Sequence, residues 1–385
     1  MSGPLLTKGF EVEMFTGQRD GVVVGCAAEA AQALEGFVTE PDNRNLEYTT
    51  PPEADYGKQL AYLLAPRQLL RCWLAERDLT LLPGSTLSLG DSTRFVRSNP
   101  ENSYHGSIEE LYGTRVVTAS VHINLGMRAM EPLFAGLRLL RCEGALLLAL
   151  SASSPFLDGQ ATGAQSQRWL QFPLTPPEVP LFLSHEHYVT WMHEQLALGS
   201  MLNVRHLWTS VRPNGERRPE SLNRLEIRIC DLISDPRLLL AVTAWAELRL
   251  IQLLAEPKRF DPLHASALSP GELAALADQN DRAAARSGLN ARLRHWRIGE
   301  DWVARDWLQE ELAAMMPLAK QLDLDATLEP LNAVLDMGSE SMCWLDRHRA
   351  GEPIDRIIAT EAMAMEARDL ALWAQLATDR AHALG

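Results

Sequence analysis

The segment Ser221–Asp231 alternates strictly between polar and apolar side chains. If it is extended, Leu225, Ile227 and Ile229 point to one side, and the residues between them point to the other. A period of two is typical of a β-strand with one apolar and one polar face. The polar face of this predicted strand places a carboxylate between two guanidiniums; its members are Arg224, Glu226, Arg228 and Cys230.

Four further segments show the same alternation, and we predict a β-strand for each. They are Leu6–Glu13, Asn43–Thr49, Arg115–Gly126 and Val204–Arg212. The turn sequence Pro213-Asn214-Gly215 follows the last of these. We therefore expect Val204–Arg212 and Ser221–Asp231 to form an antiparallel hairpin.

Apolar residues at helical spacing predict helices between and after the strands. The predicted helices are Tyr56–Arg77, Glu131–Leu150 and Ser184–Gly199, with an almost wholly helical pattern from Pro236 onward. The segment Leu79–Ser98, rich in Gly, Ser and Thr, is expected to hold short elements and loops, and the small-residue segment Ser151–Trp169 is expected to be a structured loop. Strands joined by hairpins and helices, followed by a helical last third, are typical of an α+β fold rather than of alternating β–α–β units.

Carboxylates recur on the polar faces of three predicted strands. They belong to Glu11, Glu13, Glu47 and Glu226. Acids on one sheet face repel one another and lose solvation unless cations neutralise them, and Mg²⁺ at phosphate-transfer sites takes carboxylate ligands. His122 and Asn124 add an imidazole and an amide to the same kind of face. Each strand alone is also compatible with a charged face in water, but the recurrence favours a metal site.

Arginines form a second group of candidate residues, because a guanidinium fork suits carboxylate and phosphate recognition. They are Arg168, Arg205, Arg212, Arg224 and Arg228. Arg205 and Arg212 fall on opposite faces of their predicted strand, so at most one of them lines a site. Arg224 either pairs with a neighbouring acid or contacts a substrate.

Several familiar site motifs are missing from the sequence. Neither GxGxxG nor GxxxxGK[ST] occurs, so a Rossmann site or a P-loop is not supported. Ser85, Ser153 and Ser154 lie in predicted loops without a GxSxG elbow, which disfavours a serine hydrolase. His185 and His187 lack the spacing of a helical metal pair and are interpreted as surface or capping residues.

The overall composition limits the expected partners. A formal charge of −14 over 385 residues argues against nucleic acid or an anionic membrane as a partner. The five cysteines are scattered and form no CxxC pair, which favours reduced thiols in a cytoplasmic protein over disulfides or a zinc site. Composition does not determine the oligomeric state, and the sequence is compatible with a homodimer.

Blocks that follow one another along nearly the whole chain resemble the cyanobacterial-type glutamate–cysteine ligases of the carboxylate–amine ligase family. They are KGFEVE at 8–13, RNLEYTTPP at 44–52, PGSTLSLG at 83–90, TASVHINLG at 118–126, SASSPFLDGQATG at 151–163, LNVRHLWTSVRPNG at 202–215, NRLEIRICD at 223–231 and, more weakly, QNDRAAARSGLNA at 279–291. The resemblance implies a glutamine synthetase-like fold, in which an antiparallel sheet curves into a funnel and helices pack outside it. We expect one catalytic domain over 1–385, with a sheet-forming core at 1–260 and a helical region at 261–385 packed on the core.

The activity that this resemblance implies is the ATP-dependent joining of the γ-carboxylate of L-glutamate to the amine of L-cysteine, which begins glutathione synthesis. It implies a γ-glutamyl phosphate intermediate and two or more Mg²⁺ ions. The alternative is a ligase of the same fold that joins glutamate to a different amine. A non-catalytic glutamate or nucleotide binder is disfavoured, because the acids and Arg228 are retained.

Matching the family's motifs residue by residue implies roles for individual side chains. The implied metal ligands are Glu11, Glu13, Glu47, Glu226 and His122. Arg228 is expected to face the transferred phosphoryl group or glutamate, and Glu226 and Arg228 are the expected catalytic pair. Further candidate contacts to substrate or ATP are Asn124, Arg168 and Arg212.

Overall fold

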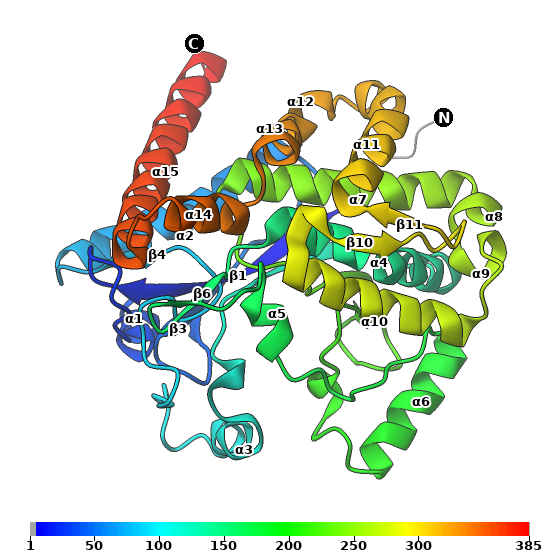
Figure 1. Ribbon diagram of the computed structural model, residues 1–385, viewed down its shortest axis with the longest axis horizontal. Coiled ribbons are helices and arrows are strands. Elements are labelled where there is room, and N and C mark those ends of the chain that lie inside the picture. Colours follow the sequence, from blue (N-terminus) through cyan, green and yellow to red (C-terminus); the bar gives the residue numbers. More distant parts are fainter. Residues whose placement is uncertain (1–4, 385) are drawn as a thin grey trace.

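A seven-stranded antiparallel sheet lies at the centre of the computed structural model, which describes residues 5–384 (Figure 1). The strand order is β2-β3-β1-β5-β9-β8, and β4 pairs with the end of β1. The strands are β1 (Lys8–Gly17), β2 (Phe37–Thr39), β3 (Asn45–Thr49), β4 (Thr80–Leu82), β5 (Val121–Gly126), β8 (Val211–Asn214) and β9 (Arg224–Ile227). Two short hairpins stand outside this sheet: β6 (Phe156–Leu157) with β7 (Gln160–Ala161), and β10 (Arg292–Arg294) with β11 (Asp301–Val303).

Helices pack on the apolar face of the sheet and on one another. Helix α4 contacts strands β8 and β9 as well as helices α7 and α10, and α2 packs on α7 and α15. The helices are α1 (Ala27–Ala33), α2 (Tyr56–Ala75), α3 (Ser103–Tyr112), α4 (Met130–Ser151), α5 (Gln167–Gln171), α6 (His185–Ala197), α7 (Pro236–Ala255), α8 (Pro257–Phe260), α9 (Pro262–Ala265), α10 (Pro270–Ser287), α11 (Ala304–Gln321), α12 (Asp325–Leu328), α13 (Pro330–Met337), α14 (Glu340–Arg349) and α15 (Ile354–Leu384).

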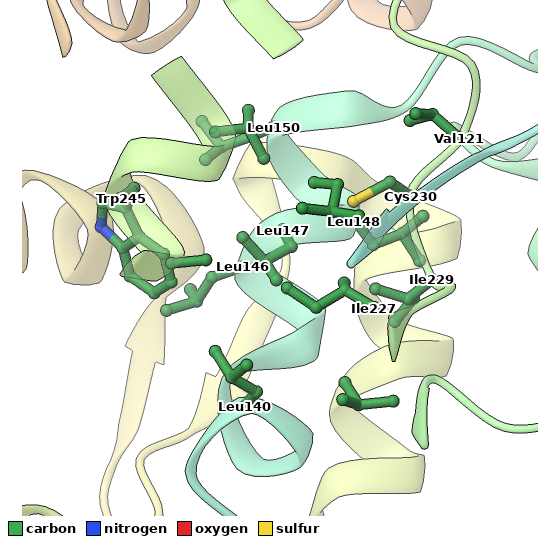
Figure 2. Packing of buried hydrophobic residues seen from close by; sticks show 14 of the residues in the cluster. Val121, Leu140, Leu146, Leu147, Leu148, Leu150, Ile227, Ile229, Cys230 and Trp245 are labelled. Atoms are coloured by element: carbon green, nitrogen blue, oxygen red, sulfur yellow. The ribbon is translucent and has the colours of Figure 1, made fainter. Parts of the chain in front are cut away.

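The main core lies between the sheet and helices α4 and α7. Leucines 146–148 of α4 pack with Ile227 and Ile229 from the sheet side and Trp245 from α7, all fully buried (Figure 2). Burying one such side chain contributes about 1.5–3 kcal/mol. Helix α7 is apolar and long enough to cross a membrane, but 83% of that window is buried inside the protein. Its apolar surface is therefore used in the core.

The structure confirms the α+β class and three of the five predicted strands, with shifted boundaries. The three are β1, β3 and β5, and α2, α4 and α6 confirm the predicted helices. The segment Leu79–Ser98, where short elements and loops are expected, contains the short strand β4, which pairs with β1. A strand of three residues is too short for alternation to reveal it.

The predicted strand Val204–Arg212 is wrong over most of its length. Its first residues form a 3₁₀ turn, Val204–His206, and the strand is β8, Val211–Asn214. Pro213 and Asn214 thus belong to the strand rather than to the turn after it. Pro213 is tolerated there because β8 is the edge strand of the sheet, where a missing N–H removes no interior ladder bond.

The predicted strand Ser221–Asp231 is shorter, because a β-bulge interrupts it after Ile227. The backbone N–H groups of Arg228 and Ile229 both donate to the Ser210 carbonyl, at 2.8 and 3.1 Å. A bulge shifts the alternation by one residue. Cys230 is therefore buried in the apolar core instead of sharing the polar face with Glu226, which corrects the prediction (Figure 2).

Candidate metal and active site

Three carboxylates meet at one end of the polar sheet face. Glu13 on β1 lies directly opposite Glu47 on β3, and Glu40 follows the neighbouring strand β2. One oxygen from each of the three lies within 4.8 Å of the others. Burial, together with repulsion from the other acids, raises the pKa of Glu47 to about 10 and that of Glu40 to about 8. The cluster thus lacks enough positive charge of its own to ionise fully.

The donor set of this cluster fits a hard divalent cation such as Mg²⁺. It offers only oxygen ligands, and Mg²⁺ prefers carboxylates at phosphate-transfer sites. A bound dication would also offset the burial and the repulsion between acids that raise the pKa values of Glu40 and Glu47.

A second cluster lies next to the first along the same face and joins Glu11, His122 and Glu226. Glu11 on β1 faces His122 on β5, and the His122 Nδ1 atom lies 2.9 Å from Glu11 Oε2 and 3.7 Å from Glu226 Oε1. The Nε2 atom of His122 lies 3.1 Å from Ser120 Oγ. One ligand atom from each of the three lies within 4.8 Å of the others, so two carboxylates and an imidazole can share one cation.

Glu226 is fully buried, and its carboxylate is surrounded by donors. Arg212 binds it with two hydrogen bonds, at 2.8 and 2.9 Å, and Arg228 Nη1 lies 2.5 Å from Oε1. The Asn214 amide donates to the same carboxylate at 2.5 Å. Burial opposes ionisation, but Arg212 and Arg228 outweigh it and hold the pKa of Glu226 well below its usual range. Glu226 is therefore a permanent anion.

Arg228 connects this carboxylate to the second cluster. Its Nη1 atom also lies 3.4 Å from His122 Nδ1, and its side chain is 12% exposed. The guanidinium thus stands at the second cluster, beside His122 and Glu226.

The remaining predicted residues lie around these clusters with partners of their own. The Asn124 amide donates to Glu11 at 3.1 Å and accepts from Arg224 Nε at 3.0 Å. Arg212 is 7% exposed and bound to Glu226. Arg168 is buried, and its guanidinium donates to the carbonyls of Arg228 and Ile229. The predicted substrate contacts of Arg168 and Arg212 stay predictions, because protein groups already occupy these guanidiniums.

Sequence reasoning missed Glu40. In the structure Glu40 directly follows β2, in which Val38 lies opposite Glu47. Strand β2 has only three residues, so its alternation was too short to stand out.

A cavity of about 690 Å³ opens beside the second cluster. Glu11 and Asn124 are among its lining residues, and Arg128 and Arg224 add positive charge. Thr49, Thr50 and the backbone around Gly9 complete the wall. A separate cavity of about 670 Å³ lies between α7, α8 and α11, lined by Arg249 and Phe260, and none of the clustered carboxylates borders it.

Residues 7–361 match the family model described as glutamate–cysteine ligase family 2. The chain belongs to this family. It is 27% identical to a putative glutamate–cysteine ligase 2-3 of Rubrobacter xylanophilus, over 79% of each protein. It is 26% identical to a putative glutamate–cysteine ligase 2 of Gloeobacter violaceus, over 79% of this chain and 80% of the relative.

Two solved structures share the fold of this family member. A glutamate–cysteine ligase of Francisella tularensis in complex with AMP has a TM-score of 0.68 at 13% identity and covers 99% of this chain and 94% of its own. A bifunctional glutathione synthetase of Pasteurella multocida has a TM-score of 0.71 at 16% identity and covers 94% of this chain. The chain spans about half of that bifunctional protein, 52%. The arrangement of the sheet and helices is therefore similar to that of a solved glutamate–cysteine ligase. The family match supports a carboxylate–amine ligase.

Proposed function

We propose that the protein joins the γ-carboxylate of L-glutamate to the amine of L-cysteine at the expense of ATP, giving γ-glutamylcysteine, ADP and phosphate. This is the first step of glutathione synthesis. The observation that carries the proposal is the pair of neighbouring cation-type clusters on one sheet face, with Arg228 beside them. The proposal follows the family's described activity and includes a cytoplasmic location and one catalytic domain over 1–385.

Two Mg²⁺ ions fit the residues present. Glu13, Glu40 and Glu47 would hold one ion, and Glu11, His122 and Glu226 would hold the other. Bound there, the ions would neutralise phosphate oxygens and lower the barrier to phosphoryl transfer.

The chain's own residues then supply orientation and charge. In the first step an oxygen of the glutamate γ-carboxylate attacks the γ-phosphorus of ATP, and ADP leaves with the bonding pair. Arg228 is held by Glu226 and presents its guanidinium to the equatorial oxygens of the transferred group. In the second step the cysteine amine attacks the γ-carbonyl carbon, phosphate leaves, and the amine loses a proton to a base that we do not assign.

The 690 Å³ cavity is the proposed nucleotide site, because Glu11 and Asn124 are among its lining residues and its size suits a nucleotide. Arg224 lines it and has no carboxylate partner among the described residues, so its charge is available to phosphate oxygens. The Francisella tularensis relative carries AMP, which agrees with a nucleotide site in this fold.

The direct test compares amines. Purified protein with ATP, Mg²⁺ and L-glutamate is given L-cysteine or one of a panel of other amines, and ADP release and product mass are measured. The proposal predicts cysteine-dependent ADP release and a γ-glutamylcysteine peak. Turnover with glutamate and another amine, but not with cysteine, would reject this proposal in favour of a ligase of the same fold that joins glutamate to a different amine. The absence of any glutamate-dependent turnover would reject both.

A further inference from the structure

A fully buried carboxylate lies directly behind the bulge that carries Arg228. Asp231 accepts the backbone N–H of Ser153 at 3.0 Å and the hydroxyls of Ser154 and Ser166 at 2.7 and 2.8 Å. Asp231 and all three serines are 0% exposed. Burial raises the pKa of the Asp231 carboxyl, and each of these donors, together with Arg168, acts in the opposite direction by stabilising the ionised form.

The two serine hydroxyls also determine where helix α5 begins. Ser154 Oγ accepts the backbone N–H of Arg168 at 3.1 Å, and Ser166 Oγ accepts that of Trp169 at 3.2 Å as the N-cap of the helix. Each hydroxyl thus donates to Asp231 and accepts from the first turn of α5. Asp231 is in this way linked to the position of the Arg168 backbone.

Arg168 links the same carboxylate to the bulge. Its Nη1 atom lies 3.7 Å from Asp231 Oδ1 and donates to the Ile229 carbonyl at 3.1 Å, while its Nη2 donates to the Arg228 carbonyl at 2.9 Å. On the other side of the backbone, the N–H groups of Arg228 and Ile229 share the Ser210 carbonyl. The backbone of Arg228 and Ile229 is therefore held through its N–H groups by Ser210 and through its carbonyls by Arg168.

We propose that Asp231, acting through Ser154, Ser166 and Arg168, is a positioning residue that fixes the bulge and thereby aims the Arg228 guanidinium at Glu226 and the reacting phosphoryl group. We call these four residues the Asp231 clamp. A bulge left without the clamp has several backbone conformations of similar energy, and a displacement of about 1 Å at a catalytic group costs on the order of a hundredfold in rate. The inference rests on the proposed function, because it takes Arg228 to face the transferred group.

The chain contains a matched control for a substitution in the clamp. Asp261 is 3% exposed and pairs with Arg138, whose guanidinium donates to the carbonyls of Phe182 and Leu183. Like Asp231, Asp261 is thus a buried carboxylate beside a buried arginine that binds two backbone carbonyls, although Asp261 also hydrogen-bonds its arginine directly. Asp231→Asn and Asp261→Asn both replace one acceptor oxygen by a donor and both perturb a buried arginine.

The experiment measures kcat and KM for glutamate and ATP per folded molecule, with Tm as the stability readout. We expect Asp231→Asn to lower kcat roughly ten- to a hundredfold, with both KM values changed less than about threefold. Asp261→Asn should lower Tm while kcat stays within about twofold. Equal kcat losses in the two variants would overturn the inference, and so would a KM change without a kcat change, since that marks a direct substrate contact.

A double-mutant cycle tests whether the clamp acts through Arg228. The double variant Asp231→Asn with Arg228→Lys should be no slower than Arg228→Lys alone, whereas additive losses would contradict the clamp. If the wild-type protein releases no ADP with glutamate, the proposed function is rejected. The positioning role of Asp231 can then still be tested with a crystal structure of the Asp231→Asn variant. There the 2.5 Å contact between Arg228 and Glu226 should be lost, and its persistence would overturn the inference.

Discussion

Glu13 on β1 and Glu47 on β3 lie directly opposite each other in the sheet register. Two carboxylates at a directly opposed pair repel and destabilise a sheet. Glu40 adds a third acid to the same spot. The folded protein without a bound ion therefore carries an electrostatic cost that a divalent cation would remove.

This cost predicts that Glu47→Gln stabilises the metal-free protein. Glutamine folds without the proton that the Glu47 carboxyl must take up at neutral pH, so the free energy of unfolding should rise by about 1 kcal/mol in the presence of a chelator. The same variant should lose most of the stabilisation that Mg²⁺ gives the wild-type protein. Chemical denaturation with EDTA and with Mg²⁺ measures both effects, and the exposed acid Glu110→Gln serves as the control. An equal response of Glu47→Gln and wild type to Mg²⁺ would contradict the metal assignment.

Glu226→Gln should abolish turnover and also weaken the fold. The structure shows Glu226 as the partner of both Arg212 and Arg228. Leaving buried guanidiniums without their counter-charge costs about 3–5 kcal/mol. Urea denaturation and ADP release measured on the same preparation separate the two effects. Normal turnover in a stable variant would place the site elsewhere.

Arg228→Lys should lower kcat by about a hundredfold or more while KM for ATP changes little. A lysine keeps the positive charge but cannot present two N–H groups in a plane to Glu226 and the transferred group. Steady-state kinetics with saturating cysteine provide the measurement. Arg224→Lys, at the rim of the cavity, should instead act mainly on KM for ATP. A reversal of these two patterns would exchange the proposed roles of the arginines.

Alternation along the chain predicted β1, β3 and β5, together with the acids that they carry, because these strands have one apolar and one polar face throughout. Alternation did not predict the features that depend on contacts between residues far apart in the sequence. The bulge after Ile227 depends on a shared bond to Ser210, so the position of Cys230 could not be read from its neighbours in sequence. Glu40 was missed because its strand is too short. The partners of Arg168 come from segments about 60 residues away, which no local pattern reveals.

The stability of the fold should depend on pH through Glu340. This side chain is partly buried, and desolvation raises the pKa of its carboxyl from 4.5 to about 7, although Ser234 donates to it and Arg368 is near. Between these two values the folded state binds a proton that the unfolded state releases. The free energy of unfolding therefore falls as pH rises through this window, by an amount on the order of 2 kcal/mol. In the Glu340→Gln variant, the free energy of unfolding should change less with pH. Urea denaturation between pH 4.5 and 7.5 measures this dependence. A variant whose free energy of unfolding falls with pH as steeply as that of the wild type would exclude Glu340 as the cause.

The central claim is that the face carrying Glu13, Glu47, Glu226 and Arg228 activates a carboxylate by phosphoryl transfer. The most direct measurement uses L-glutamate labelled with ¹⁸O in the γ-carboxylate, with ATP, Mg²⁺ and cysteine, followed by mass spectrometry of the released phosphate. An acyl phosphate that breaks at its C–O bond transfers one labelled oxygen to phosphate in each turnover, and this is the predicted result. Unlabelled phosphate, or label recovered in AMP, would contradict the account.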